Sequence, residues 1–175
     1  MQKSTTGDVL AIDQGTHCGV VRGDGTGLPV VKTWDLPSER ELLGEMLFDL
    51  RVRLIKEIKA GPLTAIVFET PLLDLRKPNL VTWRKLYAIA GTIETICYEF
   101  NVPCMEMDAG TWKRSFCGTG RVSKKDKPYP PMVRCQDLGI KVNNMDEADA
   151  VGIWATWHGS KGVAWLAGDL FRSLL

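Results

Sequence analysis

Four carboxylate side chains occupy positions from which they could act together on a phosphate group. Asp13 ends one apolar run and Glu69 closes another, while Asp146 and Asp149 lie three residues apart, so that they share one helical face. Carboxylate oxygens are the ligands that Mg²⁺ and Mn²⁺ prefer. The pattern predicts a site for two Mg²⁺ ions, with Mn²⁺ as a substitute, that hydrolyses a phosphodiester bond with a metal-activated water.

Each residue by itself has a more ordinary interpretation. An aspartate after a strand is more often a turn former or a helix cap than a ligand. Glu147 stands between the paired aspartates but points to another side of the helix, so we expect it in solvent. A lone histidine is more often a structural residue than a ligand, so His17 and His158 are assigned no role.

Basic residues are concentrated in one stretch of a chain whose net charge is only +1. Seven of them fall between Lys113 and Arg134 against one acid, Asp126. Such an excess suits a polyanion at one edge of the protein and a solvated loop about equally well. Among the tryptophans, Trp83 is the one expected to contact nucleic acid, whereas Trp154 is expected in the core.

Hydrophobic patterning predicts the elements that must position these residues. Strands are expected at 9–12, 19–22, 30–34, 64–69 and 102–107. Helices are expected at 43–58 after a Ser38–Glu41 capping box, at 86–100, in a short segment capped by Asp108, and from Met145 onward, with residues 128–131 as a breaker. Strands first and then alternating helix and strand indicate an α/β fold, a mixed five-stranded sheet with helices on both faces.

Length and composition indicate one domain over residues 1–175, with 159–175 as an extra helical tail. No apolar run approaches the roughly 20 residues of a membrane span, and no secretory signal is evident, so a cytoplasmic protein is expected. The five cysteines contain no C-x-x-C pair and are expected to be reduced.

The order of these motifs resembles the RuvC family of Holliday-junction resolvases, which belong to the ribonuclease H-like superfamily and occur in bacteria and their phages. The resemblance runs from about Val9 to Trp157 and is carried by AIDQGTHCGV, IVFETP, WKRSFCGTGRVSKK and DEADAVGIW. It implies a homodimer that cuts branched DNA and leaves 5′-phosphate and 3′-hydroxyl ends. The implied site residues are the metal ligands Asp13, Glu69, Asp146 and Asp149 and the catalytic and DNA-binding lysines Lys113 and Lys124. From the basic stretch around these lysines, Arg114, Arg121 and Lys125 are further expected DNA contacts.

The chain departs from that family where an aromatic wedge commonly follows the catalytic glutamate. Here the sequence continues Thr70-Pro71-Leu72, so Leu72 is the candidate apolar wedge.

Three other functions stay open from the sequence. AIDQGT also looks like a phosphate-binding motif of actin-like kinases, although 175 residues are too few for their two domains. Ribonuclease H-like domains also cut the RNA of RNA–DNA hybrids or act as 3′ exonucleases on other nucleic acid. A decayed site would leave a DNA-binding module. The two lysines favour a resolvase over the hybrid nuclease, and the intact set of acids argues against decay.

Overall fold

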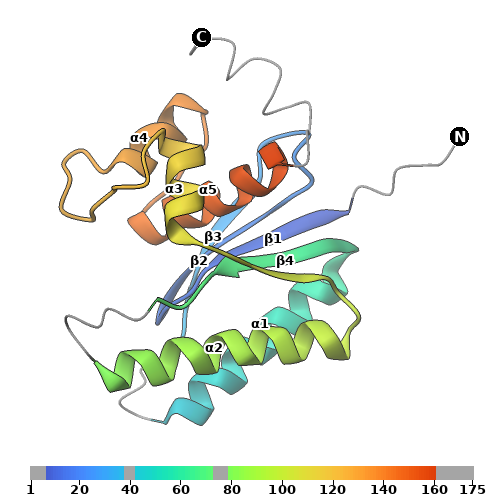
Figure 1. Cartoon of the computed structure of the whole chain (residues 1–175). Coiled ribbons are helices and arrows are strands. Elements are labelled where there is room, and N and C mark those ends of the chain that lie inside the picture. Colours follow the sequence, from blue (N-terminus) through green and yellow to red (C-terminus); the bar gives the residue numbers. More distant parts are fainter. Residues whose placement is uncertain (1–6, 38–41, 73–78, 161–175) are drawn as a thin grey trace, which may run out of the picture.

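The computed structural model describes residues 7–37, 42–72 and 79–160. One sheet runs through these residues in the order β3-β2-β1-β4-β5 (Figure 1). Its strands are β1 (Asp8–Asp13), β2 (His17–Gly23), β3 (Val30–Asp35), β4 (Leu63–Glu69) and β5 (Cys104–Met107). The helices are α1 (Leu43–Ala60), α2 (Leu80–Glu99), α3 (Ala109–Cys117), α4 (Pro130–Asp137) and α5 (Met145–Ser160). β1, β2 and β3 pair antiparallel, whereas β4 lies parallel to both β1 and β5.

Helices cover both faces of this sheet. α1 and α2 pack on one face, and α3, α4 and α5 lie over the other (Figure 1). Successive side chains of β1 point to opposite faces, so Leu10 and Ile12 enter the core beneath α1 and α2, while Val9 and Ala11 face α5. A strand covered on both sides must be apolar throughout, as β1 is. The predicted α/β class and the mixed five-stranded sheet are confirmed.

Two glycines let helices come unusually close to their neighbours. A Cβ atom at Gly19 of β2 would lie 1.8 Å from the carbonyl oxygen of Asp146, so the first turn of α5 rests directly on the strand. A Cβ atom at Gly152 would lie 2.6 Å from the Trp112 ring, so α3 also packs closely on α5. Together they bring two helices to the strand ends that carry the predicted acids.

The region around residues 128–131 differs from its prediction as a breaker. Pro130 begins α4, and prolines at the first helical positions are compatible with a helix because their missing N–H has no partner there anyway. The buried residues Pro131 and Cys135 then attach α4 to the core. The capping box at Ser38–Glu41 and the tail after Ser160 lie outside the described residues.

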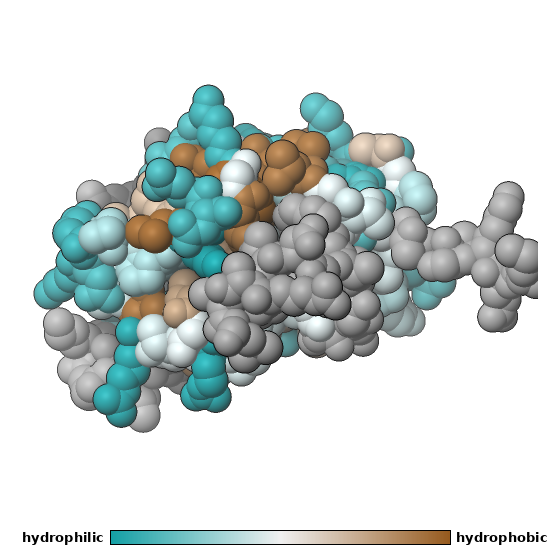
Figure 2. Space-filling model, turned by 90° about the horizontal axis from the view of Figure 1, so that it is seen from above, coloured by the Kyte–Doolittle hydropathy of each residue, from teal (hydrophilic) through white to brown (hydrophobic). Residues whose placement is uncertain are grey.

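The remaining observations concern the predicted cap of α3, the cysteines, the surface and the length of the helices. Asp108 caps α3 by accepting a hydrogen bond from the Thr111 amide, as predicted, and all five cysteines are free thiols. Seen from above, the largest group of hydrophobic side chains is bordered by hydrophilic ones, and smaller hydrophobic areas lie apart from it (Figure 2). Within the described ranges, no helix is long and apolar enough to cross a membrane.

Candidate active site

The predicted acids come together at the carboxyl ends of β1 and β4. Ile12 pairs with Phe68 in the parallel register, so the residues that follow, Asp13 and Glu69, lie side by side. The first turn of α5 adds Asp146 and Asp149. The resulting pocket has a volume of about 380 Å³ and is lined by Asp13, Gln14, Gly15, Thr16, His17, Glu69, Lys113, Lys124, Asp146 and Asp149.

Glu69 is held in place from two sides. The indole N–H of Trp112, which is fully buried in α3, donates to Glu69 Oε2 at 2.7 Å. The side-chain amide of Gln14 donates to the Glu69 carbonyl at 2.7 Å. A side chain held by a buried indole has few alternative rotamers, so the carboxylate keeps a fixed direction at the end of its strand.

Asp149 is almost fully buried and has a phenol as its partner. Tyr129, itself 3% exposed, donates its hydroxyl to Asp149 Oδ1 at 2.7 Å. Burial raises the pKa of Asp149 to about 6, against the opposing effects of the Tyr129 hydrogen bond and of Lys124. Tyr129 could not be identified from the sequence, because it stands between prolines in a segment whose composition predicts a breaker.

Asp13 also has a raised pKa in this pocket. Burial raises its pKa well above the ordinary value, and the negative charges of Asp149 and Glu69 raise it further. Several buried carboxylates disfavour one another's ionisation unless positive charge neutralises them. The electrostatics of the pocket therefore favour a cation beside Asp13.

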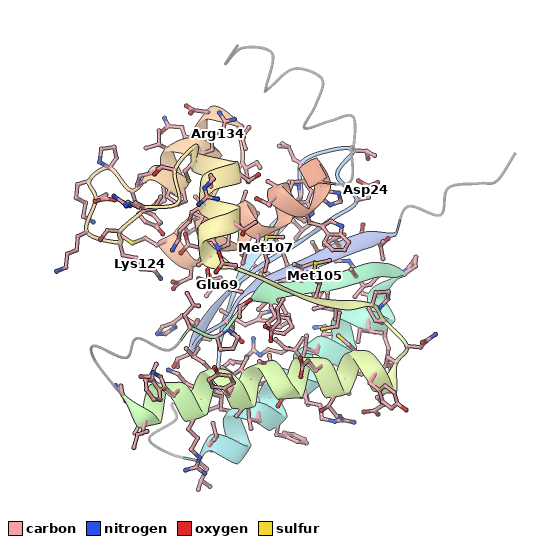
Figure 3. All side chains as sticks on the ribbon, in the orientation of Figure 1. Asp24, Glu69, Met105, Met107, Lys124 and Arg134 are labelled. Carbon is pink, nitrogen blue, oxygen red and sulfur yellow. The ribbon has the colours of Figure 1, made fainter. Side chains whose placement is uncertain are left out.

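Two lysines supply positive charge at this pocket. Lys124 Nζ lies 2.7 Å from Asp146 Oδ1 and 4.0 Å from Asp149 Oδ2. Burial alone would lower the pKa of Lys124, but the hydrogen bond to Asp146 and the neighbouring acids raise it overall, so the amine stays charged. Lys113 lines the same pocket and places its Nζ 5.1 Å from the centre of the Trp112 ring. Figure 3 shows Lys124 on the same side of the sheet as Glu69.

The donor set fits divalent metal ions in its chemistry. Within the described part of the chain, no three His, Cys, Asp or Glu side chains converge closely enough to hold one metal ion as they stand. Glu69, Asp149 and Asp146 are instead engaged by an indole, a phenol and an ammonium group. The acids nevertheless surround one pocket, and the buried Gln14 Oε1 on its wall has no hydrogen-bond partner. Oxygen donors without a neutralising ion are what a hard cation would satisfy.

The remaining predicted contacts lie outside the pocket. Arg114, Arg121 and Lys125 are exposed and do not line it. Leu72 is 56% exposed three residues beyond Glu69. Trp83 is half-buried in the first turn of α2, whereas Trp154 is fully buried as expected.

Glu147 was predicted to be solvated, and this was wrong. It is 3% exposed and accepts hydrogen bonds from the Thr33 hydroxyl at 2.8 Å and the Asn143 amide at 2.6 Å. It does point away from the paired aspartates, but the side it faces is packed against β3 rather than open to water. Its partners make it a structural anchor between α5 and the sheet.

Comparison with solved structures identifies the fold. No protein-family model and no curated protein sequence matches the chain. A structure of RuvC from Thermus thermophilus has a TM-score of 0.68 and 20% identity, covering 89% of this chain and 97% of that one. The same protein in complex with a Holliday junction substrate has a TM-score of 0.71 and 19% identity, covering 89% and 96%. The yeast mitochondrial Holliday junction resolvase has a TM-score of 0.53 and 13% identity, covering 97% and 85%. The predicted ribonuclease H-like fold of the RuvC type is therefore confirmed.

Proposed function

We propose that this protein is a metal-dependent endonuclease that resolves four-way DNA junctions. The observation that carries the proposal is one pocket that combines Asp13, Glu69, Asp146 and Asp149 with Lys113 and Lys124. The shared fold supports it, since one of the similar structures is a RuvC bound to a Holliday junction substrate. The chain acts as a single nuclease domain in the cytoplasm of a bacterium, encoded by the bacterium or by a phage.

The four acids would hold two Mg²⁺ ions, which Mn²⁺ could replace. Ions held there would supply activation of a water and stabilisation of the oxygen that leaves. Trp112 and Tyr129 keep two of the carboxylates directed into the pocket. Their hydrogen bonds prepare the ligand geometry before any substrate arrives.

The lysines act on the phosphate. Lys113 and Lys124 place positive charge where a scissile phosphate would meet the acids, and this charge stabilises the additional negative charge of the transition state. Cleavage of the bond to the 3′ oxygen leaves a 5′-phosphate and a 3′-hydroxyl. The exposed Arg114, Arg121 and Lys125 continue the positive surface along the DNA backbone.

Opening of the junction and assembly rest on exposed apolar side chains. Leu72, close to the pocket in sequence and exposed, is the wedge between base steps, and Trp83 adds a contact from α2. A four-way junction has two equivalent strands to cut, which requires two sites related by a two-fold axis. The face of α2 that carries Ile89 and Ile93 is buried within the monomer, and we place the homodimer contact at the exposed Val81 and Tyr87 of the same helix.

The test is cleavage of a synthetic four-way junction, a matched linear duplex and an RNA–DNA hybrid, each in Mg²⁺, Ca²⁺ and EDTA. Paired symmetric nicks on the junction in Mg²⁺, absent from Asp146→Asn, support the proposal. Cleavage of the hybrid alone would assign the pocket to RNA hydrolysis. No cleavage of any DNA by the folded protein in Mg²⁺ or Mn²⁺ would refute the resolvase.

A further inference from the structure

A histidine and an aspartate form a hydrogen-bonded pair at the edge of the acidic pocket. His17 begins β2 and Asp35 ends β3, and the two are direct partners in the antiparallel register. His17 Nδ1 lies 2.6 Å from Asp35 Oδ1. His17 lines the pocket together with Asp13 and the other acids, and its side chain remains 67% exposed. The ring is therefore both oriented and accessible to a bound substrate.

The surrounding structure holds this pair firmly. The Leu36 amide donates to the Thr16 carbonyl at 2.9 Å, which extends the ladder around the pair. Arg53 of α1 donates to the Asp35 carbonyl at 3.1 Å. Lys85 of α2 donates to the Thr16 hydroxyl at 3.0 Å. The strand register and both helices beneath the sheet thus fix the backbone from which His17 and Asp35 project.

The hydrogen bond decides which ring nitrogen is available. An ionised carboxylate can only accept, so the hydrogen shared with Asp35 belongs to His17 Nδ1. In the neutral ring, Nε2 then carries a free lone pair. The hydrogen bond to Asp35 holds the ring by Nδ1 and leaves Nε2 on the side that is not engaged by the carboxylate. This arrangement is suited to accepting a proton at Nε2.

We propose that His17, oriented by Asp35, is a catalytic residue that accepts the proton of the attacking water. This inference rests on the proposed nuclease function. In the step, the water proton moves to His17 Nε2, and the water oxygen forms a bond to phosphorus. The bond from phosphorus to the 3′ oxygen breaks, and that oxygen leaves with the electron pair and takes a proton from solvent. The protonated ring then returns its proton to solvent through the open side of the pocket.

Other charged groups near the ring set its electrical surroundings. From the pocket wall these are Asp13, Glu69, Lys113, Lys124, Asp146 and Asp149, from β3 Asp35, and from α1 and α2 Arg53 and Lys85. In the proposed function the lysines of the wall place positive charge on the phosphate and the acids are the metal ligands. Among the ionisable side chains that line this pocket, His17 is the one that neither task uses.

The experiment measures single-turnover cleavage of a four-way junction in Mg²⁺ across pH 5.5 to 9, together with junction affinity in Ca²⁺. His17→Ala should cleave about 100-fold more slowly, within the usual range for a general base, and should bind the junction as tightly as the unmodified chain. Added imidazole should restore part of the rate of His17→Ala and should leave Asp146→Asn inactive. Asp35→Asn should slow cleavage by roughly 10-fold and alter the dependence of rate on pH.

A matched control is Asp24→Asn, at the far end of β2. Asp24 caps its own turn by accepting from the Thr26 amide at 2.9 Å, an interaction that asparagine preserves. Figure 3 shows Asp24 at the opposite end of the sheet from Glu69 and Lys124. Its rate and pH profile should equal those of the unmodified chain.

The outcomes separate this inference from the proposed function. Junction cleavage by the unmodified chain and its loss in Asp146→Asn establish the nuclease independently of His17. A His17→Ala rate within threefold of the unmodified chain, or a slow variant that imidazole does not rescue, would overturn the catalytic role of His17 and leave the nuclease intact. If the unmodified chain cuts no nucleic acid, the function and this inference fall together.

Discussion

A methyl group at Gly19 should abolish the proposed junction cleavage without replacing any of the four carboxylates. In the structure, a Cβ atom there would lie 1.8 Å from the carbonyl oxygen of Asp146. A carbon and a carbonyl oxygen in contact lie about 3.3 Å apart, so α5 would have to move by roughly 1.5 Å. Because α5 carries both Asp146 and Asp149, this movement shifts half of the acidic set relative to Asp13 and Glu69.

The size of the effect follows from that displacement. Misplacement of reacting groups by about 1 Å can reduce a rate by 100-fold, so Gly19→Ala should lower single-turnover junction cleavage by at least about that factor. Overpacking of this kind also costs about 1–3 kcal/mol of folding free energy. The assay is cleavage in Mg²⁺ at saturating protein and at a temperature well below the midpoint of thermal unfolding of the variant.

The control is Gly44→Ala in the exposed first turn of α1, where an added Cβ meets nothing within 4 Å. It should match the unmodified chain in rate and keep or slightly raise its stability, since alanine is the better helix former. A Gly19→Ala protein that cleaves at the unmodified rate would refute the reasoning, because the acids would then tolerate a displaced α5.

Three further predictions concern a residue that holds Glu69, two exposed basic residues and a buried histidine. Trp112→Phe keeps an aromatic ring but removes the N–H that donates to Glu69. It should lower the free energy of unfolding, measured in urea, by about 1.5–3 kcal/mol and should slow cleavage. An unchanged cleavage rate would mean that Glu69 does not need this hydrogen bond. Double replacement of Arg121 and Lys125 by alanine should weaken junction binding and reduce the slope of log affinity against log salt by about 2. The cleavage rate at saturating protein should stay the same. An unchanged slope would show that these residues do not contact the DNA. Burial lowers the pKa of His158 below its ordinary value of 6.5, so the unfolded chain binds more protons at this residue and stability should fall as the pH drops below about 6.5. His158→Gln should lose this part of the acid sensitivity in thermal melts at pH 5 and 7.5. A pH dependence identical to that of the unmodified chain would refute the prediction.

The fold could be predicted because its main elements are decided locally. The continuous apolar runs before Asp13 and Glu69 are typical of strands covered on both faces, and the helical spacing in 43–58 and 86–100 is long enough to be unambiguous. Once those strands are adjacent and parallel, their carboxyl ends must coincide. The proximity of Asp13 and Glu69 could therefore be predicted from the sequence, as could the shared face of the two aspartates in α5.

The supports of the acids could not be predicted in the same way. Trp112 binds Glu69 across 43 positions of the sequence and Tyr129 binds Asp149 across 20. Such contacts depend on how α3 and α4 pack against α5, which is decided by close approaches such as the one at Gly152. Nothing local distinguishes a tryptophan that orients a carboxylate from one that only fills the core.

The surroundings of Glu147 and His17 could not be predicted from a single helix or strand. Helical geometry correctly separates Glu147 from its neighbouring aspartates, yet it does not tell whether the other side of the helix meets water or β3. His17 looks like an isolated turn residue until the register of β2 and β3 places Asp35 opposite it. In both cases the hydrogen-bond partner lies on β3, whose position depends on the whole sheet. The role of such a residue can be assigned only when its neighbour on the adjacent strand is known. A paired histidine beside four acids has a different set of possible tasks from a lone one, and this difference is what the cleavage experiment with His17→Ala and imidazole measures.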